Sequence, residues 1–243
     1  MYLYKTNIKT NEMNINNLIV EVTRKCNMYC DHCLRGDAMN MNIKKEYIDS
    51  VLSQVDNIGN VCFTGGEPSL NLPAMEYFLS ECKRRRISLE FFYITTNAVK
   101  VTESFVMFCL KMYSYCDNKE MCRVDVSNDR YHMDEADFDM SMLQGLSFVG
   151  KKYEKDNFNF AGGTSLISEG RSSNTKGAHK PYDHIEIDSV NSFTDECDIY
   201  LNCKGEIING CNWSYASQKK HKLCNVGELT EYYQKLIDAE VYS

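Results

Sequence analysis

The run Lys25-Cys26-Asn27-Met28-Tyr29-Cys30-Asp31-His32-Cys33 places three cysteines within eight residues. A C-x3-C-x2-C spacing lets three thiolates converge on one iron–sulfur cluster and leaves one iron without a protein ligand. An iron with an open position is a place where another molecule can bind and react. Structural zinc sites usually pair C-x2-4-C with a second Cys or His pair, so zinc and incidental thiols are the weaker alternatives.

Length and charge narrow the class of protein. The chain has 243 residues, 12 cysteines and a formal net charge of −7. This length suits one α/β barrel-like domain, or a domain with a small appendage. The negative charge argues against broad attraction to nucleic acid or to an anionic membrane.

The start of the chain has no features of a signal peptide. Polar, Asn- and Thr-rich sequence follows Met1 to Thr6, and no apolar run approaches the length of a membrane span. We therefore expect a cytoplasmic protein with no membrane segment, whose cysteines stay reduced and available to metal.

The hydrophobic pattern alternates between two periods along the chain. Short apolar and β-branched runs predict strands at 17–22, 61–64, 89–95 and 122–127, with less regular strand material at 158–163 and 164–167. Helical spacing predicts helices at 43–58, 72–82 and 103–113. Strands separated by helices imply a parallel sheet with right-handed crossovers, whose active face is the carboxyl ends of the strands.

Chemically suggestive residues follow three of these strands. Thr64-Gly65-Gly66-Glu67-Pro68 closes the second strand, Thr96-Asn97 the third, and Ser127 to His132 the fourth. Two glycines let the backbone approach a ligand, and Glu67 can pair with a cationic group. Each segment alone could be an ordinary turn, but together they line one rim of the sheet.

The cysteine loop after a first strand, followed by Gly65-Gly66-Glu67-Pro68 after the second, resembles the radical S-adenosylmethionine (radical SAM) superfamily. The resemblance covers roughly residues 17 to 170. It implies an α/β fold, a partial (β/α)6 barrel over residues 1–180, with a [4Fe–4S] cluster on Cys26, Cys30 and Cys33.

The resemblance also implies a SAM site. The open iron would bind the amino and carboxylate groups of SAM, and an electron from a donor such as flavodoxin or ferredoxin would cleave SAM to methionine and a 5′-deoxyadenosyl radical. That radical would abstract a substrate hydrogen. The residues implied to hold SAM are Gly65, Gly66, Glu67 and Pro68 at its amino group, His32 near adenine, and Asn97, Ser127, Asp129 and Arg171 around its ribose or carboxylate.

A second set of cysteines lies near the end of the chain: Cys197, Cys203, Cys211 and Cys224. Residues 199–211 predict two short strands around a Lys204-Gly205 turn, and a final helix follows 225–229. The arrangement resembles SPASM and twitch extensions, and four cysteines fit the smaller twitch type. We expect an extension over 181–243 with one auxiliary [4Fe–4S] cluster, although the Gly-x5-Cys spacing departs from the usual Gly-x4-Cys. Zinc or no metal are the alternatives.

Three functions remain open from the sequence. Relatives with such extensions commonly modify peptide or protein side chains, and we take this as the first expectation. Fewer than twenty residues precede the first strand, too few for a winged-helix leader-binding domain, so a nucleotide, a modified base or a cofactor precursor is the alternative substrate. A non-catalytic iron–sulfur or zinc module is the third, and it would not need Gly65-Gly66-Glu67-Pro68.

Overall fold

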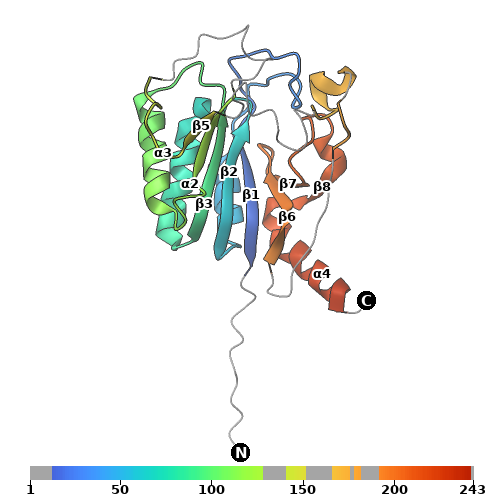
Figure 1. Ribbon diagram of the computed structural model, residues 1–243. Helices are drawn as coiled ribbons and strands as arrows, with labels where there is room; N and C mark the ends of the chain where they lie inside the picture. The colour runs from blue at the N-terminus through green and yellow to red at the C-terminus, as the bar shows by residue number, and fades with distance from the viewer. Residues whose placement is uncertain (1–12, 128–140, 152–165, 176–177, 182–191, 242–243) are drawn as a thin grey trace, which may run out of the picture.

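A computed structural model of the protein describes residues 13–127, 141–151, 166–175, 178–181 and 192–241. Side chains are not described at a few of these positions, Cys197 among them. The described residues build one sheet with helices packed against it (Figure 1).

The strands are β1 (Asn14–Thr23), β2 (Asn57–Gly65), β3 (Ser88–Thr96), β4 (Arg123–Val126), β5 (Val149–Lys151), β6 (Ser192–Leu201), β7 (Glu206–Asn209) and β8 (Lys222–Asn225). The α-helices are α1 (Lys45–Leu52), α2 (Leu72–Arg85), α3 (Glu103–Tyr115) and α4 (Leu229–Val241). Short 3-10 helices are η1 (Pro68–Asn71), η2 (Gly170–Asn174), η3 (Gln218–His221) and η4 (Val226–Glu228).

The strands run in the spatial order β5-β4-β3-β2-β1-β6-β7-β8. Neighbours are parallel from β5 through β6, while β7 and β8 are antiparallel additions. The predicted α/β class is confirmed, and the barrel is partial because the sheet stays open between β5 and β8. The boundary near residue 180 stays a prediction, since β6 to β8 continue the same sheet on the far side of β1.

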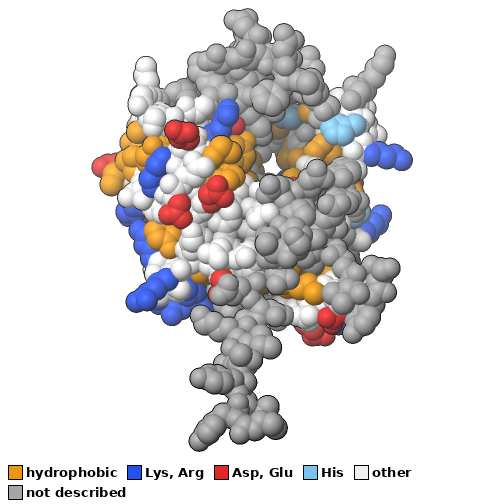
Figure 2. All heavy atoms as spheres, turned by 60° about the horizontal axis from the view of Figure 1, so that its bottom comes forward, with side chains coloured by type: hydrophobic (Ala, Val, Ile, Leu, Met, Phe, Trp, Pro, Cys, Tyr) orange, Lys and Arg blue, Asp and Glu red, His pale blue; other side chains and the backbone are white. Residues whose placement is uncertain are grey.

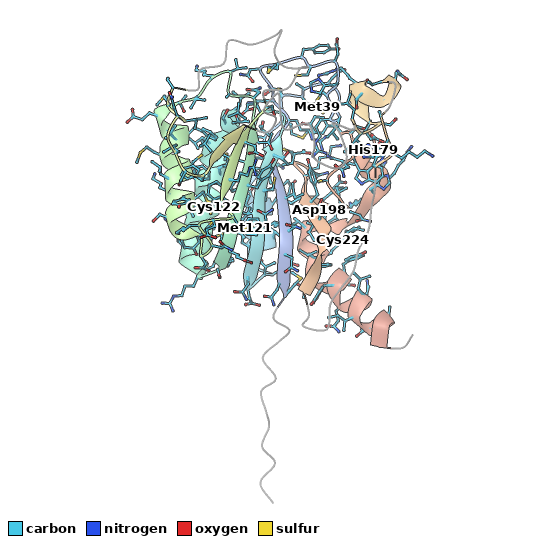
Figure 3. The ribbon with its side chains drawn as sticks, in the orientation of Figure 1. Met39, Met121, Cys122, His179, Asp198 and Cys224 are labelled. Atoms are coloured by element: carbon cyan, nitrogen blue, oxygen red, sulfur yellow. The ribbon has the colours of Figure 1, made fainter. Side chains whose placement is uncertain are left out.

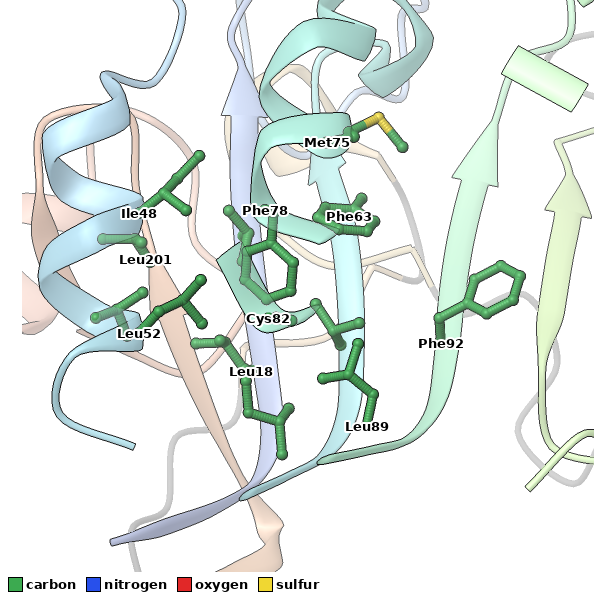
Figure 4. Packing of buried hydrophobic residues seen from close by; sticks show 14 of the residues in the cluster. Leu18, Ile48, Leu52, Phe63, Met75, Phe78, Cys82, Leu89, Phe92 and Leu201 are labelled. Carbon is green, nitrogen blue, oxygen red and sulfur yellow. The ribbon is translucent and has the colours of Figure 1, made fainter. Parts of the chain in front are cut away.

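The hydrophobic core lies between the sheet and its helices. Leu18, Phe63 and Phe92 point from β1, β2 and β3 toward the helices and are fully buried (Figure 4). Ile48 of α1 and Phe78 of α2 meet them from the other side (Figure 4). A register irregularity between Ile15 and Asn17 shifts the alternation, so Ile15 also joins this core. Beyond it, side chains alternate along the strand, and the odd-numbered residues from Asn17 to Thr23 face the opposite side of the sheet, which is polar in part.

Two predicted elements need comment. The helix expected over 43–58 covers only Lys45–Leu52, because Ile58 pairs with Ile15 as part of β2. The apolar spacing of 43–58 therefore belongs to a helix, a turn and the start of a strand, all facing one core. The strand material expected at 158–163, and the first two residues of that expected at 164–167, lie outside the described residues.

Basic side chains gather at one edge of the molecule. Figure 2 shows Lys and Arg side chains grouped at its lower left. Lys83, Arg84 and Arg86 are exposed at the end of α2, next to the start of β3. The carboxyl end of β1, where the cysteines follow, lies at the opposite edge of the sheet. None of the helices in the described ranges has the length and apolarity that a membrane crossing requires.

Candidate active site

The three cysteines of the sequence motif lie in one loop directly after β1. The loop begins at the end of β1, and the chain after it comes back to the same place. There the Met39 N–H donates to the Arg24 carbonyl at 2.9 Å, and the Ile43 N–H donates to the Val22 carbonyl at 3.0 Å. Cys30 is buried, Cys26 and Cys33 are half-buried, and none of the three is in a disulfide.

The two glycines after β2 lie directly against the start of the cysteine loop. The Gly66 N–H donates to the Thr23 carbonyl at 2.9 Å, and the Glu67 N–H to the Lys25 carbonyl at 2.8 Å. A Cβ on Gly65 would stand 1.9 Å from the Thr23 oxygen, and one on Gly66 would stand 2.1 Å from the Lys25 oxygen. Gly65 also has φ +143°. The close approach that these glycines permit is therefore to the chain's own backbone, not only to a ligand.

Glu67 is a buried carboxylate with an exposure of 2%. Its oxygens accept hydrogen bonds from the Thr96 hydroxyl at 2.8 Å, the Asn97 N–H at 2.8 Å and the Ser69 N–H at 3.1 Å. Burial raises the pKa of Glu67, while these hydrogen bonds act in the opposite direction. Glu67 thus ties the end of β2 to the end of β3, and its contact with the amino group of SAM stays a prediction.

Asn97 connects the end of β3 to the cysteine loop. Its Nδ2 donates to Asn27 Oδ1 at 2.8 Å and lies 3.9 Å from the sulfur of Cys26. Burial raises the pKa of the Cys26 thiol, and the nearby Glu67 and Cys33 raise it further. A hydrogen bond from the Met28 N–H acts in the opposite direction and lowers this pKa. Metal binding at this loop must therefore displace a proton from Cys26.

Arg171 reaches the cysteine loop from the far end of the described barrel sequence. Its Nε donates to the Cys30 carbonyl at 2.8 Å, and its Nη1 donates to the Gly36 carbonyl at 2.8 Å and to Asp37 at 2.9 Å. The guanidinium carbon lies 4.0 Å from the centroid of the exposed Tyr29 ring. Arg171 therefore holds the cysteine loop through three hydrogen bonds. Its contact with the SAM carboxylate stays a prediction.

The remaining predicted SAM residues are distributed around the same edge. His32 is half-buried within the loop, and Pro68 is buried as the first residue of η1. Ser127 is buried just after β4, where its N–H donates to the Thr96 carbonyl at 2.8 Å. Asp129 lies outside the described residues.

The donor set of the loop has the chemistry that an iron–sulfur cluster needs. Three cysteines lie in one short loop, and none of them forms a disulfide within the described residues. In the described parts of the chain no three His, Cys, Asp or Glu side chains are gathered as tightly as a metal site requires. The binding of a cluster by Cys26, Cys30 and Cys33 therefore stays a prediction.

The cysteines expected to form a second set are not brought together. Cys224 lies on β8 opposite Ile207, in the core that the helices cover. Cys211 packs with Ile208 on the opposite face, since consecutive strand residues alternate between faces. The Cys203 thiol donates to the Glu21 carbonyl at 3.0 Å, and the side chain of Cys197 is not described. The predicted auxiliary cluster and the SPASM or twitch assignment are not supported.

The predicted hairpin is present but has another role. Residues 199–211 form the end of β6, the Lys204-Gly205 turn and β7, as expected. The segment after β7 contacts the cysteine loop: Arg35 Nη1 donates to the Trp213 carbonyl at 2.7 Å, and the Tyr215 N–H donates to the Arg35 carbonyl at 3.1 Å. Figure 3 shows Asp198 and Cys224 on this half of the sheet and Met39 above it.

A buried ionic network that the sequence analysis missed joins this segment to β1. Arg24 and Glu21 are 1% and 0% exposed, and Arg24 Nε lies 2.5 Å from Glu21 Oε1. Arg24 Nη2 donates to Gln218 at 2.5 Å, and Tyr200 Oη donates to Glu21 at 2.7 Å. The signal was present in β1, where Glu21 interrupts an apolar strand. Arg24 is three residues from Glu21, but Tyr200 and Gln218 lie 179 and 197 residues further along the chain.

The fold and this loop define an α/β partial-barrel protein with a cysteine motif of the cluster-binding type at the carboxyl edge of its sheet. Residues 20–112 match the family model described as the Radical SAM superfamily. Over these residues the chain is therefore similar to radical SAM domains.

Two curated relatives share part of this domain. An uncharacterized protein of Methanocaldococcus jannaschii is 36% identical over 91 residues, which is 35% of this chain and 32% of that protein. A putative L-lysine 2,3-aminomutase of Aquifex aeolicus is 34% identical over 73 residues, which is 27% of this chain and 20% of that protein. The chain thus spans a third or less of the length of these relatives.

Solved structures share the fold over most of the chain. Hexahistidine-tagged anSMEcpe with bound AdoMet has a TM-score of 0.56 at 12% identity, covering 92% of this chain and 80% of that one. Native anSMEcpe with bound AdoMet and the Cp18Cys peptide has a TM-score of 0.56 at 12% identity, covering 90% and 80%. At this identity the likeness shows a common fold.

Proposed function

We propose that this protein is a radical SAM enzyme that modifies a peptide or protein side chain. Cys26, Cys30 and Cys33 would hold the [4Fe–4S] cluster, and the residues around Gly66 and Asn97 would orient SAM. With both groups bound, the cofactors supply a 5′-deoxyadenosyl radical for abstraction of a substrate hydrogen.

The observation that carries the proposal is the direct joining of the two sequence motifs. Gly66 and Glu67 are hydrogen-bonded to the backbone of Thr23 and Lys25, just before Cys26. Residues 65–68 therefore border the place where a cluster on the loop would bind SAM. A purely structural cluster has no need of such a second loop.

The face of the sheet opposite the helices offers groups for a polar substrate. Tyr93 Oη donates to Asp125 at 3.1 Å, and Arg123 Nε donates to the other oxygen of Asp125 at 2.5 Å. Donors and acceptors fixed in this way can hold peptide groups in one orientation. The solved anSMEcpe complex contains a peptide beside AdoMet, which favours a peptide over a nucleotide or cofactor precursor as the substrate of this chain.

The proposal is tested with the anaerobically reconstituted, chemically reduced full-length chain. We expect the protein to bind about four irons per chain, as one [4Fe–4S] cluster requires, and to convert SAM to 5′-deoxyadenosine. Cys30→Ala should abolish both properties. Cys122→Ala is the matched control, because Cys122 is a buried thiol just before β4, at the opposite edge of the sheet (Figure 3).

The outcomes separate the three functions. Formation of 5′-deoxyadenosine that survives Cys30→Ala would refute the assignment of the loop. A cluster that forms without any cleavage of SAM would favour the non-catalytic module. Reduced flavodoxin or ferredoxin should replace the chemical reductant, which would support such a protein as the electron donor. A short peptide-encoding frame beside the gene would favour peptide modification, and nucleotide-biosynthesis genes the alternative.

A further inference from the structure

The hydroxyl group of Tyr215 is buried without a hydrogen-bond partner in the polypeptide. The residue is 8% exposed, and its Oη is shielded from solvent. A buried hydroxyl without a partner is costly, and native proteins rarely tolerate one. Such a hydroxyl is available to a group that the polypeptide itself does not supply.

The surroundings of Tyr215 place this group at the cysteine loop. The Tyr215 N–H donates to the carbonyl of Arg35, two residues beyond Cys33. The guanidinium carbon of Arg24, two residues before Cys26, lies 4.3 Å from the centroid of the Tyr215 ring. Tyr215 is therefore fixed between the two ends of the motif.

The charged or ionisable groups that influence the pKa of the Tyr215 hydroxyl include Glu21, Arg35, Arg24 and Cys33. The two arginines are donors only and cannot accept its proton.

Glu21 has no acceptor capacity left for this hydroxyl. Its Oε1 accepts from Arg24 Nε and from the Cys203 N–H, and its Oε2 accepts from Tyr200 Oη and Gln218 Nε2. A carboxylate offers about four such positions. Of these four groups, the sulfur at Cys33 is the acceptor that remains.

We propose that Tyr215 Oη donates a hydrogen bond to cluster sulfur on the Cys33 side of the loop and thereby raises the reduction potential of the cluster. The inference rests on the proposed cluster. Reduction adds one negative charge, and a hydrogen bond to sulfur stabilises the more negative form. Tyr215 is a positioning residue, because it acts on the substrate only through the cluster.

The test is a potentiometric titration of the reconstituted full-length protein without SAM, followed by the electron paramagnetic resonance signal of the reduced cluster. Tyr215→Phe removes only the hydroxyl. At the wild-type midpoint we expect its ratio of reduced to oxidised cluster to fall several-fold; a tenfold fall corresponds to about 59 mV for one electron. Tyr233→Phe is the matched control, because Tyr233 is 1% exposed and packs on Phe193 in the helix-covered core. It should titrate as wild type.

A second measurement separates this role from a structural one. Without a cluster the Tyr215 hydroxyl lacks a partner, so the metal-free Tyr215→Phe variant should unfold at the wild-type temperature or above it. A lower temperature would mean that the hydroxyl bonds within the polypeptide, and it would overturn the inference.

The inference and the proposed function fail in different ways. A wild-type titration curve for Tyr215→Phe, in protein that holds a cluster and cleaves SAM, overturns the inference alone. A shift seen only when SAM is present also overturns it, since the hydroxyl would then serve SAM. Wild-type protein that assembles no cluster overturns both.

Discussion

Replacement of Arg24 by Met tests the buried ionic network directly. Arg24 is 1% exposed and lies 2.5 Å from the fully buried Glu21. Removing one partner of a buried ion pair typically costs about 3–5 kcal/mol, because the other charge is left buried. Glu21 keeps three other donors, from Tyr200, Gln218 and Cys203, so we expect the lower end, about 3 kcal/mol.

The assay is urea unfolding of the reduced, metal-free full-length chain, followed by circular dichroism. With a slope of about 2 kcal/mol per molar urea, the midpoint of Arg24→Met should fall by about 1.5 M. Arg84→Met is the matched control, since Arg84 makes a pair with Glu81 at the same 2.5 Å but is 62% exposed. Because Arg84 is largely exposed and Glu81 keeps its second partner Arg85, loss of this pair should cost less than about 1 kcal/mol.

Comparison of the two variants decides the question. The double variant Glu21→Gln with Arg24→Met should lose less free energy of unfolding than Arg24→Met alone. In the double variant no carboxylate charge is left buried without Arg24. If Arg24→Met lowers the free energy of unfolding no more than Arg84→Met does, the network does not stabilise the fold and our reasoning is wrong.

Two further predictions concern the loop and its support. Gly66→Ala should prevent cluster assembly, measured as iron per chain after reconstitution, because its Cβ would meet the Lys25 oxygen at 2.1 Å; Gly227→Ala, whose Cβ would lie 3.7 Å from its nearest neighbour, should retain the iron. Burial alone would raise the pKa of Glu169, but hydrogen bonds from Ser214 and Ser217 outweigh it and lower the pKa. A lowered pKa adds stability above the unfolded value of about 4.3 and loses it at lower pH. Thermal unfolding from about pH 6 to pH 3 should therefore depend less on pH in Glu169→Gln than in wild type; equal slopes would contradict the assignment.

Local sequence signals were sufficient for the barrel half of the molecule. Strands β1 to β4 and helices α2 and α3 lie where the periodicity predicts them, because each buries a face that its own residues define. The positions of the cysteine loop and of Gly65-Gly66 followed from the rule that parallel strands end at one edge. The hairpin of β6 and β7 was also predicted, from its Lys204-Gly205 turn.

The role of the C-terminal segment could not be predicted from local signals. Cysteine spacing suggested a second cluster, but β7 and β8 turn Cys211 and Cys224 to opposite faces of the sheet. The pairing of β6 with β1 and the partners of Glu21 depend on contacts between distant residues, which no short motif encodes. Gly65 and Gly66 are also required by the close approach of the Thr23 and Lys25 carbonyls, which only the backbone geometry reveals.

The position of β1 between β2 and β6 has a consequence for the order of folding. Leu18 pairs with Val61 soon after synthesis, but its other partner, Ile199, arrives much later in the chain. Until then one edge of β1 exposes unpaired backbone groups, beside the Glu21 carboxylate, whose partners Tyr200, Cys203 and Gln218 have not yet been made. Such distant pairing slows folding and leaves an edge open to aggregation. We therefore expect the arrival of β6 to be the step that commits the nascent chain to its native sheet.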